Sequence, residues 1–491
     1  MDKKYQSYYT KNALITSYMA SMISPFSECK ILEPCGGDGV FIDELLNSND
    51  SFVIDTYDLD PNAIETLNKK YKNEKRVFVF EGDTLFHETL DKLEKNPIYD
   101  RVIGNPPYGA WLDYGTRDLL RKKYKGYYAS ESYSLFIIRC LNLLKDGGVL
   151  SFIIPDTYLF LNMHKSLRKT LLTKTRIKEI LIFPSKFFPG VSFGYSNMSI
   201  ITFEKCSVEE ACLNNCITII NNFKNVNQFD DVKNRKLHKL SVKLICQKDI
   251  FANHNHSFLL DDEVTNLINK SNVKLGDIAN CVTGIYCGDN TKFIFALDEN
   301  VKNSKNYSFV DKKLIYNGTV DNNGLDGEQH FIEIIKSSSE TKFIRKEHPW
   351  FIDWSKTAIH HYLTDKKARF QNSSYYFQKG IAIPMVKSSK INATLMNGNV
   401  FDQSIVGIFC NDDSYVLYIL AFLNSDVANK IIHTINPTAN NSANYLKQIP
   451  IIINESAQEK INKIMNEIIQ KQDYSPDQLT EINNIFNNLY K

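Results

Sequence analysis

The tetrapeptide Asn105-Pro106-Pro107-Tyr108 is the segment of this sequence whose residue types point most specifically to chemistry. Two consecutive prolines make the loop rigid, because each proline ring fixes a backbone torsion angle. The amide oxygen of Asn105 and the carbonyl of Pro106 are then two acceptors at a fixed spacing, suited to the two hydrogens of a ring-attached amino group. Such hydrogen bonds would draw the nitrogen lone pair out of conjugation and aim it at an electrophile. The Tyr108 ring offers a face on which a base can stack.

A glycine-rich loop, Glu33-Pro34-Cys35-Gly36-Gly37-Asp38-Gly39, follows one predicted strand and precedes a predicted helix. Glycines let a backbone approach a bound ligand closely. The loop lacks the GxGxxG spacing of dinucleotide-binding sites and the Lys-Ser/Thr of a phosphate-binding loop. Because Glu33 and Asp38 would repel phosphate, the loop favours a ligand that carries positive charge. A purely structural turn is the alternative.

Two further acids, Asp58 and Asp83, end the next two predicted strands. An acid in the place of Asp58, about 20 residues beyond a glycine loop, is suited to bind a ribose diol. The carboxylate of Asp83 could accept a hydrogen bond from the amino group of an adenine, or could simply cap a helix. Asp60 is predicted to be the N-cap of a helix that begins at Pro61. Together with Glu33, these strand-end acids indicate a ligand-binding edge.

All of these residues belong to a pattern of alternating strands and helices in the first 205 residues. Buried strands separated by helices are typical of a parallel, doubly wound sheet with helices on both faces. In such a sheet, ligands bind beyond the carboxyl ends of the strands. We therefore expect an α/β, Rossmann-like domain with its site at that edge. The pattern predicts strands at 28–34, 51–60, 76–83, 99–108, 149–155, 176–183 and 197–205, and a helix at 132–145.

Residues 8–205 resemble the catalytic domain of S-adenosylmethionine-dependent amino-methyltransferases that act on DNA. The order of the motifs, with the glycine loop first, the Asn-Pro-Pro-Tyr loop next and a specificity domain last, resembles the gamma group, and the closest likeness is to TaqI-type N6-adenine methyltransferases. The resemblance implies S-adenosyl-L-methionine as the cofactor and a flipped-out adenine of double-stranded DNA as the substrate. The amino nitrogen would displace the sulfonium methyl directly, so positioning would matter more than acid–base chemistry, and no metal ion is needed.

The resemblance also implies roles for individual residues. Asn105 and Pro106 would orient the target amino group, while Tyr108 and Phe188 would stack on the base, with Phe187 as the alternative to Phe188. Thr84 departs from the family, because an apolar or aromatic side chain often packs on the cofactor adenine at this position. The cofactor would contact Tyr9, Thr10, Glu33, Pro34, Gly36, Asp38, Asp58, Asp83, Thr84, Asn105 and Pro107.

The sequence changes in character after the predicted methyltransferase domain at 1–205. Residues 206–273 are predicted to be a connecting or peripheral region, because most of this segment is polar, rich in Asn and Lys, and without a clear period. Short β-like runs followed by helical periodicity predict a mixed, β-rich target recognition domain with C-terminal helices at 274–491. One such run is predicted at 313–318. Residues 282–293 resemble a segment that often opens the specificity domain of this family.

A basic and aromatic-rich stretch at 342–390 is the candidate for contacts with DNA. It holds ten basic and three acidic side chains, a net charge of +7, interleaved with aromatic residues. Basic side chains suit phosphate contacts and aromatic side chains suit base contacts, whereas a solvated surface is the alternative. A second basic run follows the Asn-Pro-Pro-Tyr loop. The residues predicted to bind DNA are Arg117, Arg121, Lys122, Lys123, Lys366, Lys367 and Arg369.

Composition and charge exclude several classes of protein. The 491 residues are 43% hydrophobic and 23% charged, as in ordinary globular proteins of several domains. The net charge is only +2, so any surface for nucleic acid must be local. No apolar run approaches the roughly 18 residues of a membrane helix, and no signal peptide or paired zinc pattern is present. We therefore expect an intracellular protein with no membrane partner and no metal, and the resemblance implies a protein of the bacterial cytoplasm that binds DNA as a monomer.

Other functions remain as alternatives. The sequence shows no PD…ExK nuclease pattern, so we expect modification only, with a separate restriction endonuclease left open as a partner. The enzyme alternatives are amino-methylation of cytosine at N4 or of RNA, although Asn105 favours adenine because N4-cytosine enzymes more often carry Ser there. A catalytically idle DNA-binding specificity protein is the alternative from another class. The presence of Asn105, Tyr108, Glu33 and Asp58 argues against it. Cys35 lies in the glycine loop, which disfavours the covalent mechanism of C5-cytosine methyltransferases.

Overall fold

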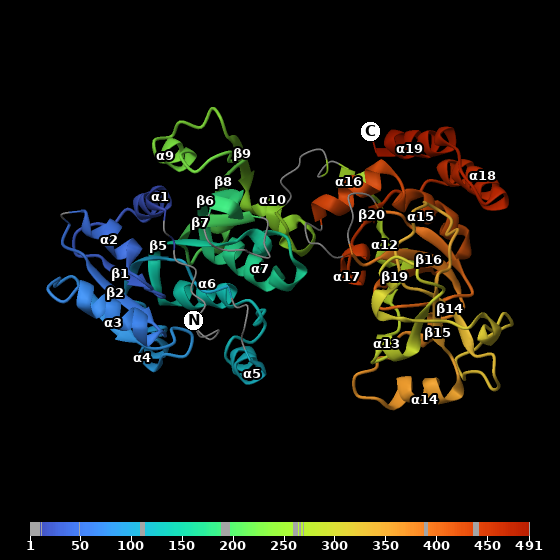
Figure 1. The fold of residues 1–491 in the computed structure, drawn as a ribbon. Helices are drawn as coiled ribbons and strands as arrows, with labels where there is room; N and C mark the ends of the chain where they lie inside the picture. Colours follow the sequence, from blue (N-terminus) through green and yellow to red (C-terminus); the bar gives the residue numbers. More distant parts are fainter. Residues whose placement is uncertain are drawn as a thin grey trace. The chain divides into compact units, whose positions relative to one another are not determined.

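The computed structural model shows two compact units, Met1–Leu260 and Asp261–Lys491, each with its own hydrophobic core (Figure 1). Here they are called unit 1 and unit 2, and each is described by itself. The structure describes residues 10, 12–48, 50–108, 113–187, 197–258, 264, 267–268, 270–386, 391–435 and 441–490.

Unit 1 is built on a nine-stranded sheet in the order β3-β2-β1-β4-β5-β7-β6-β8-β9. The first five strands of this order are parallel, and β7 is antiparallel to both of its neighbours. The order reverses between β1 and β4, which is where ligands bind in doubly wound sheets. The predicted Rossmann-like α/β fold is therefore confirmed. The strands are β1 (Lys30–Glu33), β2 (Val53–Asp58), β3 (Val77–Glu81), β4 (Tyr99–Gly104), β5 (Leu144–Pro155), β6 (Thr175–Pro184), β7 (Asn197–Lys205), β8 (Cys216–Asn221) and β9 (Ser241–Cys246).

Helices cover both faces of this sheet, with α1 and α2 on one side and α6 and α7 on the other (Figure 1). The predicted cap of α3 is confirmed, because the Asp60 side chain accepts a hydrogen bond from the Asn62 N–H at 3.0 Å, with Pro61 in the first turn. The helices are α1 (Ala13–Ile23), α2 (Val40–Leu46), α3 (Pro61–Lys70), α4 (Glu88–Leu93), α5 (Tyr114–Lys123), α6 (Ser132–Leu143), α7 (Lys165–Lys174), α8 (Glu209–Leu213), α9 (Gln228–Lys233) and α10 (Gln247–Ala252).

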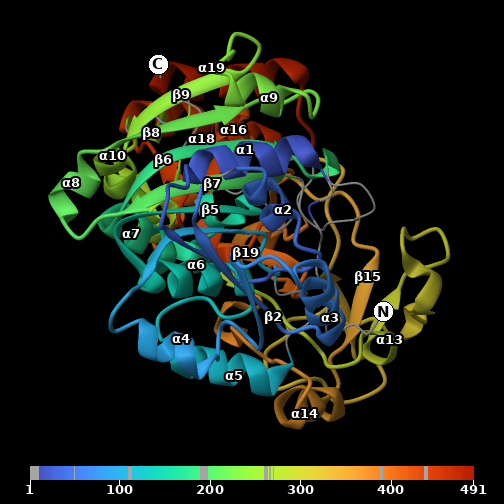
Figure 2. The same cartoon turned by 90° about the vertical axis from the view of Figure 1, so that its left-hand side faces the viewer.

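Of the two roles predicted for the segment after residue 205, residues 206–258 do not fit a simple connection and instead form a peripheral part of unit 1. Strand β8 pairs in parallel with β6, and β9 pairs antiparallel with β8, so the sheet continues for two more strands (Figure 2). Phe223 and Phe229 are buried in the same core as the rest of unit 1. An outer strand has one neighbour only, so β9 keeps exposed positions, including Val242 and Leu244.

Unit 2 contains a four-stranded sheet, β11-β19-β16-β17, a five-stranded sheet, β13-β12-β15-β14-β18, and the pair β10-β20. The predicted strand at 313–318 is wrong, because a 3-10 turn at Lys312–Leu314 occupies part of it. The strands are β10 (Val273–Lys274), β11 (Ala279–Thr283), β12 (Ile294–Ala296), β13 (Ser308–Phe309), β14 (Phe331–Ile335), β15 (Trp350–Asp353), β16 (Lys379–Pro384), β17 (Thr394–Asn397), β18 (Val400–Phe401), β19 (Ile405–Cys410) and β20 (Pro450–Ile451).

The helices of unit 2 gather mainly in its C-terminal part, as the sequence predicted. In the part of the chain that the structure describes, no single helix has the length and apolar composition needed to cross a membrane. The segments Asp413–Leu423 and Asp426–Ile435 meet that test only together, and they are bent by 79°. The helices are α12 (Leu275–Ile278), α13 (Asn290–Phe293), α14 (Lys356–Thr364), α15 (Val416–Leu423), α16 (Asp426–Ile435), α17 (Ala443–Leu446), α18 (Glu455–Lys471) and α19 (Pro476–Tyr490).

Candidate functional site

A cavity of about 390 Å³, part of it open to solvent, lies at the carboxyl edge of the unit 1 sheet. The glycine loop after β1, the end of β2 and the Asn-Pro-Pro-Tyr loop after β4 meet there. Six of the residues predicted to bind the cofactor therefore share one cavity. It is lined by Thr10, Cys35, Gly36, Gly37, Asp38, Val40, Phe41, Asp58, Asn105 and Pro107.

The glycine loop packs directly against β2. The Gly36 N–H donates a hydrogen bond to the Tyr57 carbonyl at 2.9 Å. A Cβ on Gly36 would lie 2.3 Å from the Thr56 hydroxyl oxygen, closer than two non-bonded atoms can approach. Gly39, the N-cap of α2, has a φ of 78°, which side chains rarely tolerate. Glycine at these two positions lets the backbone pass between β2 and the cavity.

The carboxylate of Asp58 ties the glycine loop to the end of β2. One oxygen accepts the Gly37 N–H at 2.8 Å, and the other accepts the Asp60 N–H at 2.9 Å. The residue is 8% exposed, and this burial raises the pKa of the Asp58 carboxyl above its usual value. Asp58 thus lines the cavity and also orders two loops around it.

Two buried carboxylate oxygens near the cavity have no hydrogen-bond partner among the described residues. They are Oε1 of Glu33, whose side chain is 1% exposed, and Oδ1 of Asp38. Desolvation raises the pKa of Glu33 well above its usual range, although its other oxygen accepts from the Thr56 hydroxyl at 3.3 Å. S-adenosyl-L-methionine carries an ammonium group, a ribose diol and an adenine amino group, all of which donate hydrogen bonds. A site with unpaired acceptors therefore fits the cofactor that the sequence predicted.

The carboxamide of Asn105 is held at both ends. Its Nδ2 donates to the Thr10 hydroxyl at 3.1 Å, and its Oδ1 accepts from the Tyr108 hydroxyl at 2.7 Å. The Tyr108 ring is 3% exposed. An incoming amino group would therefore share Oδ1 with the tyrosine hydroxyl or replace it. This arrangement fixes the direction of the amide before any substrate is present.

Sequence reasoning missed Ser132, the first residue of α6, whose hydroxyl donates to the Pro107 carbonyl at 2.5 Å. A serine at the start of a helix is ordinarily interpreted as a cap, which is why the sequence did not reveal this contact. Burial raises the pKa of the Cys35 thiol well above its usual value, the opposite of what an attacking thiolate needs. The structure therefore agrees with the low weight that the sequence gave to covalent catalysis.

Asp83 and Thr84 follow β3 and do not line the cavity. The Asp83 carboxylate accepts the Leu85 N–H at 2.9 Å, and burial raises its pKa. The Thr84 side chain is 2% exposed, and its hydroxyl donates to the Pro34 carbonyl at 2.5 Å. Thr84 thus contacts the backbone of the glycine loop.

Two of the predicted site residues, Tyr9 and Phe188, lie outside the described residues. Phe187, the alternative to Phe188, stacks on the buried Phe183 ring with the centroids 6.2 Å apart and the planes inclined by 11°. This contact joins Phe187 to the core of unit 1. The structure does not test whether Phe188 stacks on the target base, so this role stays a prediction.

The basic run after the Asn-Pro-Pro-Tyr loop lies on α5, and its members differ in their surroundings. Arg121 pairs with Asp118 on the same helix at 2.8 Å, and Lys123 pairs with Asp91 at 2.6 Å. The Arg117 guanidinium lies 5.8 Å from the centre of the Tyr114 ring. Lys122 is exposed and has no ion pair among the described residues.

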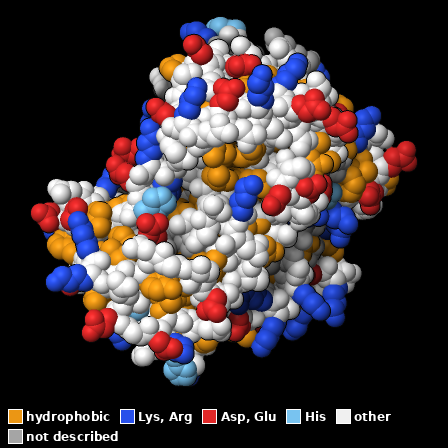
Figure 3. Space-filling model, turned by 90° about the vertical axis from the view of Figure 1, so that its right-hand side faces the viewer, with side chains coloured by type: hydrophobic (Ala, Val, Ile, Leu, Met, Phe, Trp, Pro, Cys, Tyr) orange, Lys and Arg blue, Asp and Glu red, His pale blue; other side chains and the backbone are white. Residues whose placement is uncertain are grey.

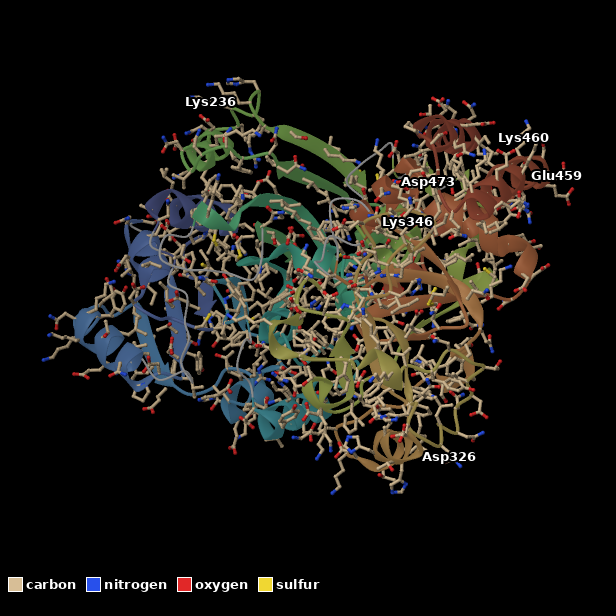
Figure 4. The ribbon with its side chains drawn as sticks, turned by 45° about the vertical axis from the view of Figure 1, so that its right-hand side comes forward. Lys236, Asp326, Lys346, Glu459, Lys460 and Asp473 are labelled. Carbon is tan, nitrogen blue, oxygen red and sulfur yellow. The ribbon has the colours of Figure 1, made fainter. Side chains whose placement is uncertain are left out.

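The basic stretch of unit 2 also separates into distinct groups. Lys342 and Arg345 point inward and donate to the backbone carbonyls of Asn424 and Ser337. Lys346 pairs with Asp473 at 2.9 Å, and the two lie side by side in Figure 4. Lys and Arg are interspersed with Asp and Glu over most of the face in Figure 3. The three residues predicted to bind DNA in this stretch, Lys366, Lys367 and Arg369, are exposed and have no ion pair among the described residues, and the same is true of Lys379.

Four aromatic residues of this stretch are buried, so the interpretation of these four as base contacts is wrong, whereas Phe370, Tyr375 and Phe377 are only partly buried. Trp350, Trp354, Tyr362 and Tyr376 are all buried in one core cluster of unit 2. They pack against each other, as in the contact between Trp354 and Tyr376 with ring centroids 6.3 Å apart. Large aromatic side chains supply most of the apolar area of a small core, which explains their density here.

Comparison with known proteins agrees with this geometry. Residues 4–188 match the family described as Eco57I restriction-modification methylase. The chain is 32% identical over 187 residues to the type II methyltransferase M.HincII of Haemophilus influenzae, covering 36% of this chain and 34% of that protein. It is 22% identical over 392 residues to the adenine-specific methyltransferase BrxX of Escherichia coli O9:H4 (strain HS), covering 77% and 30%. The chain thus spans about a third of the length of these curated relatives.

A solved structure shows the same fold over most of the chain. It is a nuclease-deletion mutant of the Type ISP restriction-modification enzyme LlaGI in complex with a DNA substrate mimic. The TM-score is 0.57 at 14% identity, with 93% of this chain and 46% of that chain covered. The sheet order shows the doubly wound α/β fold, and residues 4–188 are similar to the Eco57I restriction-modification methylases. This fold and this match imply S-adenosyl-L-methionine as the cofactor.

Proposed function

We propose that this chain is a site-specific DNA adenine methyltransferase that modifies the N6 amino group of a flipped-out adenine. The observation that carries the proposal is the oriented Asn105 carboxamide at the rim of a cavity that the glycine loop and Asp58 also line. An acceptor for an amino group and a site for the methyl donor thus meet at one sheet edge. The name of one relative, an adenine-specific methyltransferase, supports adenine, and the solved neighbour in complex with a DNA substrate mimic supports DNA.

The proposal includes the gamma-group, TaqI-type assignment, which the motif order supports. It also includes a monomer that acts on double-stranded DNA, with unit 2 as the target recognition domain. Bound S-adenosyl-L-methionine supplies an activated methyl group. Glu33 and Asp38 would accept hydrogen bonds from its ammonium end and Asp58 those from its ribose. Asn105 would orient the target amino group, with Thr10 and Tyr108 holding the amide in place. The chain's contribution is mainly positioning, which can supply a large share of a rate enhancement.

Direct sequencing of modified bases tests the proposal. DNA from cells that express the chain is compared with DNA from cells that express the Asn105→Ala variant at the same level. Methylated adenine within one short motif, absent in the variant, is the expected result. Methylated cytosine or methylated RNA would instead favour one of the alternative substrates over adenine in DNA. Unmodified nucleic acid in both samples would contradict the proposal that this chain is a methyltransferase.

Binding of the cofactor is expected to tighten as the pH rises towards neutrality. Burial raises the pKa of Glu33 above its usual 4.5, so the free protein holds a proton on this carboxyl at acidic pH. A cationic ammonium group favours the ionised carboxylate, so binding releases that proton, and affinity increases with pH until Glu33 is ionised in the free protein. Calorimetry below neutral pH, where the cofactor amino group stays protonated, measures this slope.

The Glu33→Gln variant is the matched control for this titration. It keeps the size of the side chain but has no proton to lose, so cofactor binding should be weaker and its pH slope smaller, with the remaining slope due to groups such as Asp58, whose pKa burial also raises. A slope equal to that of the unchanged protein would mean that another group titrates.

Reversing the charge of Lys366, Lys367 and Arg369 to Glu is expected to weaken DNA binding and to flatten its salt dependence. Each phosphate contact contributes about 0.9 to the slope of log K against log salt, so the slope should fall by about 2 to 3. Fluorescence anisotropy with a short duplex over a range of salt concentrations measures both effects.

The same triple reversal on α18, at Lys460, Lys463 and Lys471, is the control. These lysines are exposed, and Lys460 lies on the same unit (Figure 4). Equal losses in both triple variants would indicate a general charge effect and would remove the patch from the interface.

A further inference from the structure

Arg139 makes a buried connection between α6 and the segment that follows β3. The side chain is 1% exposed although it carries a charge. Its Nε donates to the Thr84 carbonyl at 3.0 Å, and its Nη2 donates to the His87 carbonyl at 3.0 Å. Arg139 thus donates hydrogen bonds to two backbone carbonyls, those of Thr84 and His87.

The charge of Arg139 is balanced by the same segment. Its Nη1 lies 2.6 Å from a carboxylate oxygen of Asp91 and 2.6 Å from one of Glu94. The Tyr124 hydroxyl, just beyond α5, donates to the Leu85 carbonyl at 2.9 Å. The path of residues 84–94 is therefore set by side chains from elsewhere in the domain, and Arg139 supplies most of the contacts.

Thr84 connects Arg139 to the glycine loop. Its carbonyl accepts from Arg139, and its hydroxyl donates to the Pro34 carbonyl at 2.5 Å. The residue is almost fully buried. A hydrogen-bonded path thus runs from α6 to the loop after β3 and from there to the loop after β1.

The opposite end of α6 holds the Asn-Pro-Pro-Tyr loop, through the hydrogen bond from Ser132 to the Pro107 carbonyl. Ser132 and Arg139 are seven residues apart, close to two full turns, so they lie on one face of the helix about 10 Å apart. One rigid helix therefore carries the contacts that place both loops.

We infer that Thr84 and Arg139 are positioning residues for the adenine end of the cofactor, with Arg139 acting through Thr84. They hold the segment that begins at Asp83 against the glycine loop. Helix α6 sets the distance between this segment and the Asn-Pro-Pro-Tyr loop. Thr84 thus has a role that differs from packing on the adenine ring. The inference rests on the proposed function, because it assigns the Asp83 segment to the cofactor adenine.

Thr84→Val tests the inference, because valine keeps the shape of threonine and removes the hydroxyl donor. The Pro34 carbonyl then stays buried without its partner, and the Kd for S-adenosyl-L-methionine measured by calorimetry is expected to rise about 10-fold. The effect should fall on the KM for the cofactor more than on kcat. Thr84→Ser keeps the donor and should restore most of the affinity.

Arg139→Lys tests the same path from the other end. A lysine keeps the charge beside Asp91 and Glu94 but cannot reach the Thr84 and His87 carbonyls together, so cofactor affinity should again fall. If the two residues act in one path, the double variant with Thr84→Val should lose less than the product of the two single effects. Ser132→Ala is the contrasting variant, because it loosens the other loop and should lower kcat more than cofactor affinity.

The outcomes separate the inference from the proposed function. Unchanged affinity in Thr84→Val, or an equal loss in Thr84→Ser, would overturn the inference alone, provided that the unchanged protein binds the cofactor. Failure of the unchanged protein to bind S-adenosyl-L-methionine would overturn the proposed function as well. Thermal melting of each variant shows whether a loss of binding merely follows from unfolding, and Arg139→Lys carries the test if Thr84→Val does not fold.

Discussion

Replacing Asn105 by alanine is expected to reduce methyl transfer by about 1,000-fold or more, the scale seen when one oriented hydrogen-bonding group is lost from an active site. The variant lacks the acceptor that would hold the target amino group, and the nitrogen lone pair would stay conjugated with the ring. Asn105 also lines the cavity, but the glycine loop and Asp58 remain. We therefore expect the Kd for S-adenosyl-L-methionine to change by less than about threefold. Single-turnover transfer from labelled cofactor measures the rate, and calorimetry measures the Kd.

Tyr108→Phe is the matched control for Asn105→Ala. It keeps the ring that would stack on the base and removes only the hydroxyl that donates to Asn105 Oδ1 at 2.7 Å. Because the contact from Thr10 still orients the amide, the loss of rate should be much smaller than in Asn105→Ala. A rate in Asn105→Ala near that of the unchanged protein would reject the proposed role of the carboxamide.

Replacing Asp58 by alanine is expected to raise the Kd for the cofactor by about 100-fold, since two hydrogen bonds to a charged group are lost at roughly 1 to 2 kcal/mol each. The same change removes the acceptor of the Gly37 and Asp60 N–H groups, so the glycine loop also loses its tie to β2. Asp58→Asn separates these effects, because its single oxygen can replace only one of the two acceptors. Calorimetry and thermal melting measure affinity and stability on the same samples.

Asp60→Ala is the control, since this acid lies two residues away and caps α3. Loss of an N-cap costs about 1 kcal/mol of stability, so its melting temperature should fall while cofactor affinity stays nearly unchanged. If Asp60→Ala weakened cofactor binding as much as Asp58→Ala, Asp58 would have no special place at the ribose.

The strand ends in unit 1 could be predicted because local signals mark them. Short apolar runs followed by Gly, Asp or Pro mark the ends of β1, β2 and β4, and Asp60-Pro61 marks the start of α3. Strand β9 lacks such a signal, since Cys246 is followed by Gln247 and Lys248 rather than by Gly, Asp or Pro. The extension of the sheet beyond β6 therefore became visible only from strand pairing.

Side-chain environments were less predictable than elements. A single sequence does not distinguish the buried Trp354 from an exposed tryptophan that could contact a base, so four buried aromatic residues were assigned to a DNA-binding surface. The contacts of Thr84, Ser132 and Arg139 join segments 25 to 55 residues apart, and no local pattern encodes such a distance. The Asn-Pro-Pro-Tyr loop differs, because its chemistry lies within four adjacent residues.

The seven-residue interval between Ser132 and Arg139 limits how this protein can change over evolutionary time. Substitutions within the interval keep both ends on one face of α6, but one inserted or deleted residue turns Arg139 by about 100° relative to Ser132. A longer insertion of two whole turns would restore the facing and move the two contacts about 10 Å further apart than they are now. Descendants of this sequence can therefore vary the residues of α6 far more freely than they can vary their number.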